Sequence, residues 1–210
     1  MRPMAGSHAT DVTGVILGGG QSRRMGQDKT RLVIQGETLI ERVHRLLRLA
    51  FNHIVIVGGG EFGDLLPGVP VIPDLRPMQG PLAALESAFA VTDTPLLFVV
   101  ACDMPFVSPG LACNMVQRAT ATPDVDVVAL RSAHGLEPLH AVYRRACQPV
   151  ASALLDAGER SLHALLARLS VAEVTPDEAA QFDPQGLATL NANTPEEWDA
   201  ALAQAEWWRP

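Results

Sequence analysis

Short apolar runs alternate with segments of helical periodicity along the first 120 residues of the chain. Apolar runs that stop at glycine or aspartate are typical of buried parallel strands. Apolar positions that recur every three or four residues indicate amphipathic helices. Strands that alternate with helices predict an open α/β sheet with helices on both faces. We expect strands at 13–19, 53–60, 69–74 and 95–105, and helices at 38–50, 81–91 and 108–120.

The second half of the chain adds a close pair of strands and several helices. Apolar runs flank the polar turn RSAHGLE, a spacing that favours at least one antiparallel strand. No repeat, low-complexity tract or linker interrupts the pattern, so we expect a flexible leader at 1–11 and a single domain at 12–210. We expect further strands at 125–130, 138–143, 171–174 and 187–190, and helices at 145–158, 161–169 and 194–208.

Composition narrows the classes of function. The 210-residue chain carries a formal net charge of −7, which argues against general nucleic-acid binding because that binding depends on Lys and Arg. Its three cysteines form no C-x-x-C pair, so neither a disulfide framework nor a zinc site is expected. No apolar run approaches 18 residues and the first residues lack a signal-peptide core. We therefore expect a cytoplasmic protein that does not span a membrane.

The stretch GGGQSRRMGQDK, residues 18–29, concentrates glycine and positive charge after the first predicted strand. Glycines let backbone N–H groups converge on an anion, and Arg24 and Lys29 could contact a bound triphosphate. The pattern matches neither G-x-x-x-x-G-K-[ST] nor G-x-G-x-x-G in its usual context. The alternative is a solvated glycine-rich loop, but its place at a strand end favours a ligand.

Two aspartates also follow predicted strands. Asp103 comes after LLFVVAC, and a strand-end carboxylate beside a phosphate loop suits Mg²⁺, which takes few protein ligands. Its alternative role is to cap a turn or a helix. Asp74 ends the strand at 69–74 and, taken alone, is typical of a turn residue before Pro77.

Two asparagines lie far along the chain from these groups. Asn191 and Asn193 alternate, so in an extended segment their amides face the same side and could bind a polar heterocycle or a phosphate. Alternatively, Asn193 or Thr194 only caps the last helix. Among the histidines, His140 in the PLHAVY segment is the one that could face such a pocket.

The motifs together resemble one known family. L-x-G-G-x-S-x-R-M-G-x-D-K, from Leu17 to Lys29, looks like the signature of nucleotidyltransferases that handle the molybdenum cofactor. With the later motifs, the chain resembles the molybdenum cofactor guanylyltransferase family over nearly its full length. Those motifs are PDLRPMQGPLAAL (73–85), ACDMPF (101–106), EPLHAVY (137–143), AGERSL (157–162) and NANTPEE (191–197).

The resemblance implies a Rossmann-like nucleotidyltransferase fold and a role for each matching residue. Family members often carry an asparagine where this chain has VGGG at 57–60, which places side-chain base recognition from this loop in doubt. The implied catalytic residues are Arg24, Lys29 and Asp103, with Asp103 as the metal ligand. The implied nucleotide-binding residues are Leu17, Gly18, Gly19, Gly20, Lys29, Gly58, Asp74, Gly80 and Asp103. The implied acceptor-binding residues are Arg160, Asn191 and Asn193.

The reaction implied is transfer of GMP from GTP to the terminal phosphate of molybdopterin, with Mg²⁺ as cofactor and pyrophosphate as leaving group. No general base is needed because the attacking phosphate is already ionised near neutral pH. Cofactor-insertion proteins and target molybdoenzymes are implied as partners. The alternatives are a cytidylyltransferase on the same cofactor or on a sugar or alditol phosphate, and a non-catalytic module that delivers nucleotide or cofactor.

Overall fold

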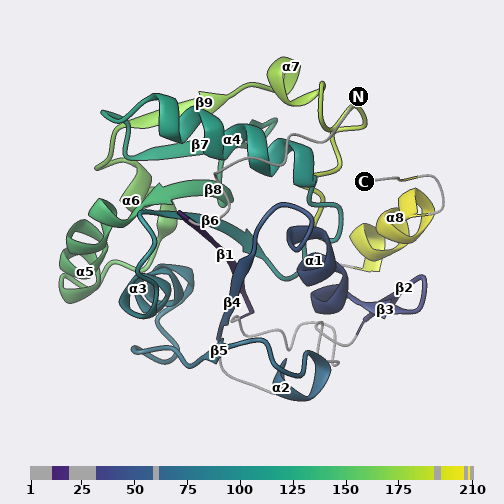
Figure 1. Cartoon of the computed structure of the whole chain (residues 1–210), viewed down its shortest axis with the longest axis horizontal. Coiled ribbons are helices and arrows are strands. Elements are labelled where there is room, and N and C mark those ends of the chain that lie inside the picture. Colours follow the sequence, from purple (N-terminus) through teal and green to yellow (C-terminus); the bar gives the residue numbers. More distant parts are fainter. Residues whose placement is uncertain (1–10, 19–31, 59–61, 192–194, 206–207, 209–210) are drawn as a thin grey trace.

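The computed structural model describes residues 11–18, 32–58, 62–191, 195–205 and 208. Within them a seven-stranded sheet runs in the order β5-β4-β1-β6-β8-β7-β9, and β2 and β3 form a separate hairpin (Figure 1). The strands are β1 (Val12–Leu17), β2 (Val33–Ile34), β3 (Glu37–Thr38), β4 (His53–Val57), β5 (Val71–Ile72), β6 (Leu96–Ala101), β7 (Val127–Ser132), β8 (Gly135–Arg144) and β9 (Val171–Val174).

The sheet is mostly parallel, as the alternation of strands and helices predicts. β5, β4, β1 and β6 are parallel neighbours, and β9 is parallel to β7. β8 runs antiparallel to both β6 and β7. The mixed α/β fold with an antiparallel strand from the second half of the chain is therefore confirmed.

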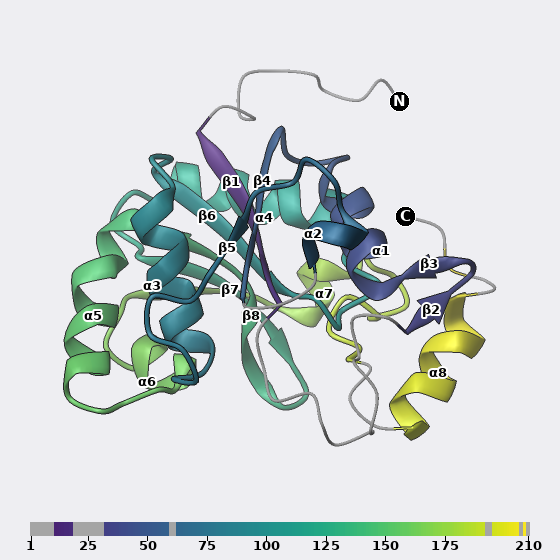
Figure 2. The ribbon, with the colours of Figure 1, turned by 90° about the horizontal axis from the view of Figure 1, so that it is seen from below.

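Helices cover both faces of the sheet. Figures 1 and 2 show α3, α5 and α6 together on one side, with α1 and α8 on the other. The helices are α1 (Leu39–Leu47), α2 (Phe62–Leu65), α3 (Pro81–Val91), α4 (Pro109–Ala121), a 3₁₀ turn at Arg145–Cys147, α5 (Gln148–Asp156), α6 (Leu162–Leu166), α7 (Pro176–Ala179) and α8 (Pro195–Ala205). Among the described residues no helix has the length and apolar character needed to cross a membrane.

Alternating side chains of the central strands divide the core into two layers. Ile16 of β1 packs with α1 and α4, whereas its neighbours Val15 and Leu17 pack with α3, α5 and α6. Successive strand residues point to opposite faces of the sheet, which is why an uninterrupted apolar run is needed when both faces are covered. Every residue of β1 and β6 is buried.

Local chemistry sets the helix ends. Thr38 and Glu41 form a capping box at the start of α1, and the Ser108 hydroxyl accepts the Leu111 N–H at the start of α4. Pro81 occupies the first position of α3, where its missing N–H leaves no hydrogen bond unmade. These residues fix where α1, α3 and α4 begin.

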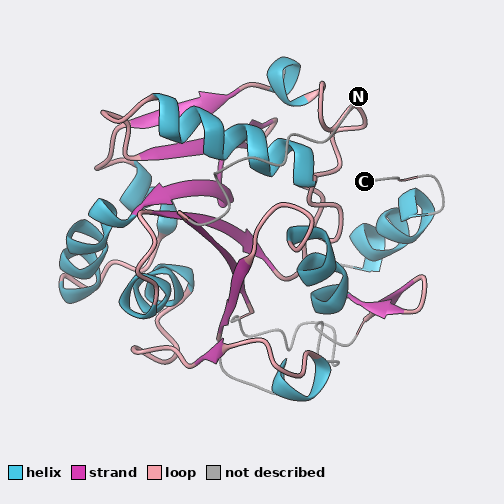
Figure 3. Ribbon diagram, viewed as in Figure 1, coloured by secondary structure: helices cyan, strands magenta, loops and turns pink. Residues whose placement is uncertain are grey.

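The expected strand at 187–190 is wrong. The Asp183 carboxylate accepts the N–H groups of Leu187 and Ala188, and Leu190 N–H donates to the Leu187 carbonyl, so this segment forms turns rather than a sheet edge. The hairpin β2–β3 and the short helices α2 and α7 were not predicted, because segments of two to four residues carry no measurable periodicity. Figure 3 shows the loops that join these elements.

Candidate active site

Backbone hydrogen bonds align the ends of four neighbouring parallel strands. Gly18 N–H donates to the Val57 carbonyl at 2.8 Å, and Gly58 N–H donates to the Ile72 carbonyl at 3.0 Å. Cys102 N–H donates to the Leu17 carbonyl at 3.1 Å. The ends of β5, β4, β1 and β6 therefore form one continuous edge, the strand-end edge, where ligands bind in open α/β sheets.

Glycine at position 18 has a packing reason as well as a proposed binding role. An added Cβ would lie 2.5 Å from the ring of Phe62, which is buried in α2. The Gly18 amide is already used by Val57, and the Gly58 amide by Ile72. These two N–H groups are thus not available to a phosphate, and any phosphate-binding amides must come from the residues that follow.

Asp103 lies two residues beyond β6, half-buried on the strand-end edge. The loop that carries it is anchored by a buried arginine of α1. Arg42 of α1 donates from Nε to the Pro105 carbonyl at 2.9 Å, and its guanidinium lies over the rings of Phe106 and Trp208, 5.6 and 5.2 Å from their centroids. The Asp103 segment is therefore fixed to α1 and to the last described residue of the chain.

Asp74 follows β5 at the other end of this edge. Its Oδ1 atom is buried and has no hydrogen-bond partner among the described residues. Burial raises the pKa of the Asp74 carboxyl above its ordinary value. A buried acceptor without a partner is costly, so this oxygen is suited to receive an N–H or O–H donor from a ligand.

Gly80 and Arg160 lie close together, although one precedes α3 and the other follows α5. Gly80 has φ of 80°, a left-handed conformation that favours glycine. An added Cβ there would lie 3.6 Å from the carbonyl oxygen of Arg160. The predicted nucleotide-binding and acceptor-binding residues thus meet at this point, with the exposed Arg160 side chain nearby.

The segment that carries Asn191 packs on the face of the sheet that α1 and α4 cover. His140 of β8 is fully buried, stands opposite Val100 of β6 and lies near the backbone of Ala188, and neither ring nitrogen has a hydrogen-bond partner among the described residues. Burial lowers the pKa of His140 to about 4, so the imidazole is neutral at pH 7. His140 is therefore part of the core beneath the 187–191 segment. Asn191 is half-buried at the end of that segment.

Five predicted site residues lie outside the described residues: Gly19, Gly20, Arg24, Lys29 and Asn193. Their roles stay predictions. Leu17, Gly18, Gly58, Asp74 and Asp103 come together on the strand-end edge, and Gly80 and Arg160 adjoin it through α3.

The two aspartates occupy different parts of this edge. β5 and β6 are separated by β4 and β1, so at about 4.8 Å per strand spacing Asp74 and Asp103 follow strands roughly 14 Å apart. No group of three or more His, Cys, Asp or Glu side chains among the described residues could enclose a metal ion. An elongated ligand could contact one carboxylate at each end.

Comparison with known proteins identifies the family of this chain. A family model described as the MobA-like NTP transferase domain matches residues 14–174. The chain belongs to this family. The match runs from within β1 to the end of β9 and includes the ends of the four strands that form the strand-end edge.

Curated members are similar over almost the whole chain. A probable molybdenum cofactor guanylyltransferase of Pelotomaculum thermopropionicum is 36% identical over 194 residues, which cover 92% of this chain and 93% of that protein. A molybdenum cofactor guanylyltransferase of Desulfosudis oleivorans is 31% identical over 193 residues, which cover 91% of this chain and 95% of that protein.

Solved structures show the same fold. Molybdopterin-guanine dinucleotide biosynthesis protein A of Archaeoglobus fulgidus superposes with a TM-score of 0.81 at 24% identity, over 93% of this chain and 100% of that chain. The 4-diphosphocytidyl-2C-methyl-D-erythritol synthase of Anaerococcus prevotii gives a TM-score of 0.70 at 11% identity, over 93% and 96%. The fold is therefore shared by proteins whose names indicate different products.

Sequence reasoning missed the side chains that hold these loops. Arg42 appears in the sequence as one polar residue of an amphipathic helix, and nothing local shows that it is 2% exposed. Glu86 did give a signal, because it is the single charged residue of the apolar helix PLAALESAFAV. A lone carboxylate in a buried helix predicts a cationic partner, and the structure supplies Arg76.

Proposed function

We propose that this chain transfers GMP from GTP to the terminal phosphate of molybdopterin and releases pyrophosphate. The observation that carries the proposal is full-length similarity, at 36% and 31% identity, to proteins named molybdenum cofactor guanylyltransferase. The strand-end edge supports it, because it presents a carboxylate at each of two separated positions to one elongated ligand.

In the proposed complex the nucleoside of GTP lies between Asp74 and Gly80. The unpartnered Asp74 oxygen would accept a hydrogen bond from the base or the ribose, which satisfies the buried acceptor. The left-handed Gly80 and the absence of its side chain leave the start of α3 open to close approach. Arg24 and Lys29 would contact the triphosphate.

Asp103 would hold Mg²⁺ at the opposite end of the edge. The residues fit this ion, since Mg²⁺ uses one or two carboxylates and takes its remaining ligands from water and phosphate oxygens. When bound, the ion neutralises charge on the phosphates during transfer. Asp103 itself is a half-buried carboxylate on a loop that Arg42 fixes through Pro105, so its place on the edge is defined before any ligand binds.

Transfer would then require positioning rather than proton abstraction. An ionised oxygen of the acceptor phosphate forms a bond to the α-phosphorus of GTP, while the bond from that phosphorus to pyrophosphate breaks. Arg160, Asn191 and Asn193 are proposed to hold the acceptor, and Arg160 lies beside Gly80, which is proposed to bind the nucleotide. In-line alignment of two anions and neutralisation of their charge supply the rate.

The proposal is tested by nucleotide choice and by turnover. Thermal shift with GTP, CTP, ATP and UTP in the presence of Mg²⁺ should show preferential stabilisation by GTP, whereas a preference for CTP would make the protein a cytidylyltransferase. Pyrophosphate release from GTP should require molybdopterin and should be lost in Asp103→Ala. Nucleotide binding without pyrophosphate release in the wild type would indicate a delivery module instead.

A further inference from the structure

The loop that carries Asp74 and Gly80, residues 73–80, has little apolar packing to hold it. We call it the β5–α3 loop. Leu75 is 58% exposed and Met78 70% exposed, and Met78 adopts φ of 66°, an uncommon backbone conformation for a residue with a side chain. A loop with exposed apolar side chains and a left-handed residue needs polar contacts to hold one conformation.

Two residues of α3, Glu86 and Ser87, supply polar contacts to this loop. The Leu75 N–H donates to Ser87 Oγ at 2.9 Å. Arg76 donates from Nε to Glu86 Oε2 at 2.8 Å and from Nη2 to Glu86 Oε1 at 3.1 Å. This bidentate geometry orients the guanidinium as well as attracting it. Glu86 is only 6% exposed and is the single charged residue of α3, so Arg76 is the cation that pairs with this buried carboxylate.

The third guanidinium nitrogen of Arg76 bonds to the end of α5, directly before the turn that carries Arg160. Its Nη1 donates to Oδ1 of Asp156, the last residue of α5, at 2.6 Å. The turn that follows, residues 157–161, which we call the α5–α6 turn, carries Arg160. Glu159 Oε1 accepts the N–H groups of Arg160 and Ser161, each at 2.8 Å, and fixes the turn.

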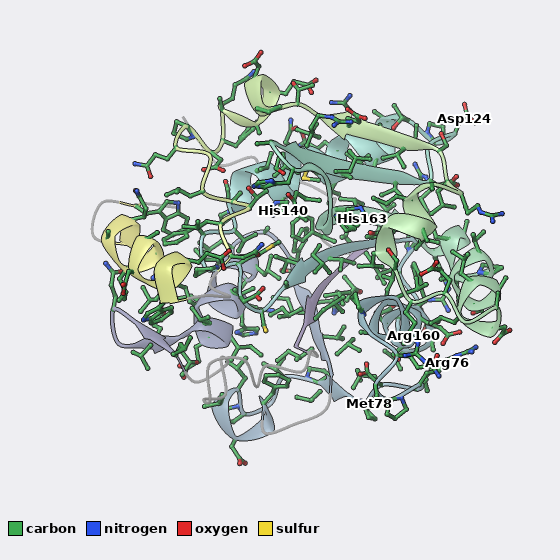
Figure 4. The ribbon with its side chains drawn as sticks, turned by 180° about the vertical axis from the view of Figure 1, so that it is seen from behind. Arg76, Met78, Asp124, His140, Arg160 and His163 are labelled. Carbon is green, nitrogen blue, oxygen red and sulfur yellow. The ribbon has the colours of Figure 1, made fainter. Side chains whose placement is uncertain are left out.

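Arg76 therefore links the β5–α3 loop to α3 through Glu86 and to the end of α5 through Asp156. Arg76 joins the β5–α3 loop to Asp156 at the end of α5, directly before the α5–α6 turn, and Gly80 lies beside Arg160 of that turn. Figure 4 labels Arg76, Met78 and Arg160 in the same part of the molecule. Asp74 and Gly80 are the proposed nucleotide residues, and Arg160 is a proposed acceptor residue. A change in Arg76 would displace both sets at once.

We propose that Arg76 is a positioning residue that sets the nucleotide-binding loop against the acceptor-binding turn, through its bidentate pair with Glu86 and its bond to Asp156. The inference rests on the proposed function, whose substrates it assigns to the two loops. In this proposal Arg76 touches neither substrate. It acts through the loop positions of Asp74, Gly80 and Arg160, and misplacement of reacting groups by about 1 Å can reduce a rate on the order of 100-fold.

Because the three hydrogen bonds of Arg76 hold different segments, we expect different substitutions to change GTP affinity and acceptor turnover differently. Arg76→Met removes all three hydrogen bonds, so GTP affinity should fall about 10-fold and the acceptor kcat/KM about 100-fold. Asp156→Asn removes only the charge on the acceptor side, so it should raise the acceptor KM several-fold and leave GTP affinity within about two-fold. Arg76→Lys keeps the charge without the planar fork and should recover little GTP affinity.

The experiment combines GTP titration calorimetry with Mg²⁺, steady-state transfer to molybdopterin, and hydrogen exchange of residues 73–80 and 157–161. Arg118→Met is the matched control, because Arg118 makes a surface ion pair with Glu178 at 2.9 Å between α4 and α7. Exchange in both segments should increase in Arg76→Met and stay unchanged in Arg118→Met. Wild-type GTP affinity together with unchanged exchange in Arg76→Met would overturn the proposal.

Loss of folding is separated from loss of positioning by a second variant. Arg76→Met combined with Glu86→Leu removes the buried carboxylate together with its partner, which should restore the melting temperature but not the affinity for GTP. Recovery of both would show that Arg76 only stabilises the fold and would overturn its positioning role. If the wild type binds no GTP, the proposed function fails, and hydrogen exchange still decides whether Arg76 holds the two segments together.

Discussion

Substitution of Arg42 tests the account of how the Asp103 loop is held. The Arg42 side chain is 3% exposed, donates from Nε to the Pro105 carbonyl at 2.9 Å, and lies over the rings of Phe106 and Trp208. Its Nη1 also donates to Gln35 Oε1 at 3.4 Å and lies 3.6 Å from the Glu37 carboxylate. Burial lowers the pKa of Arg42 from its ordinary value, and Glu37 opposes that effect.

The cost of Arg42→Met follows from these contacts. A hydrogen bond from a charged donor contributes about 1.5–3 kcal/mol, and each cation–π contact about 0.5–1 kcal/mol. Methionine retains most of the stem packing and relieves the desolvation of the guanidinium, which offsets part of the loss. We expect the free energy of unfolding to fall by about 2–4 kcal/mol.

Urea unfolding followed by far-ultraviolet circular dichroism measures this change without relying on the fluorescence of Trp208. Arg45→Met is the control, since Arg45 pairs with the same Glu37 but its side chain is 47% exposed, and such surface pairs contribute about 0–1 kcal/mol. Arg42→Lys should be nearly as destabilised as Arg42→Met, because it loses the planar stack. A loss in Arg42→Met no larger than in Arg45→Met would refute the reasoning.

Three further predictions concern single buried groups. Burial lowers the pKa of His140 in the folded protein from 6.5 to about 4. Its contribution to the free energy of unfolding is therefore fully present above pH 6.5 and should fall by roughly 3 kcal/mol as the pH drops towards 4. Urea unfolding at several pH values should show a weaker pH dependence in His140→Leu. Gly18→Ala places a methyl group 2.5 Å from Phe62 and should lower the free energy of unfolding by about 1–3 kcal/mol; an equal loss in a Phe62→Leu background would exclude that contact as the cause. Burial raises the pKa of the Cys147 thiol to about 12, so Cys147 should react with a thiol reagent only after unfolding, and labelling of Cys147 in the native protein, read by mass spectrometry, would contradict its buried placement.

Much of the fold could be predicted because its signals are local. β6 is an apolar run buried on both faces, and α3 begins at the proline expected at its first position and ends at Val91 as its apolar spacing predicts. The segment 187–190 was mistaken for a strand, because its apolar residues fit an edge strand equally well. The Asp183 carboxylate, which takes two of its N–H groups, decides between these conformations.

Only part of the candidate site could be predicted from local sequence signals. Residues that directly follow parallel strands, such as Gly18, Gly58 and Asp103, could be placed on one edge because the carboxyl ends of parallel strands meet there. The proximity of Gly80 to Arg160 and the hydrogen bond from Arg76 to Asp156 depend on how α5 packs beside α3. That docking is long-range packing with no pattern in either local sequence, so sequence alone could assign Arg160 only by family resemblance.

The central claim is that one guanine nucleotide spans the strand-end edge from Asp74 to Asp103. A crystal structure of the protein with GTP and Mg²⁺ tests it most directly. The account predicts the nucleoside between Asp74 and Gly80, with the phosphates directed towards Asp103 and residues 18–31. A nucleotide bound elsewhere, for example in the groove lined by Asn114, Arg118 and Gln181 between α4 and α7, with Asp74 and Asp103 both out of contact, would contradict the claim.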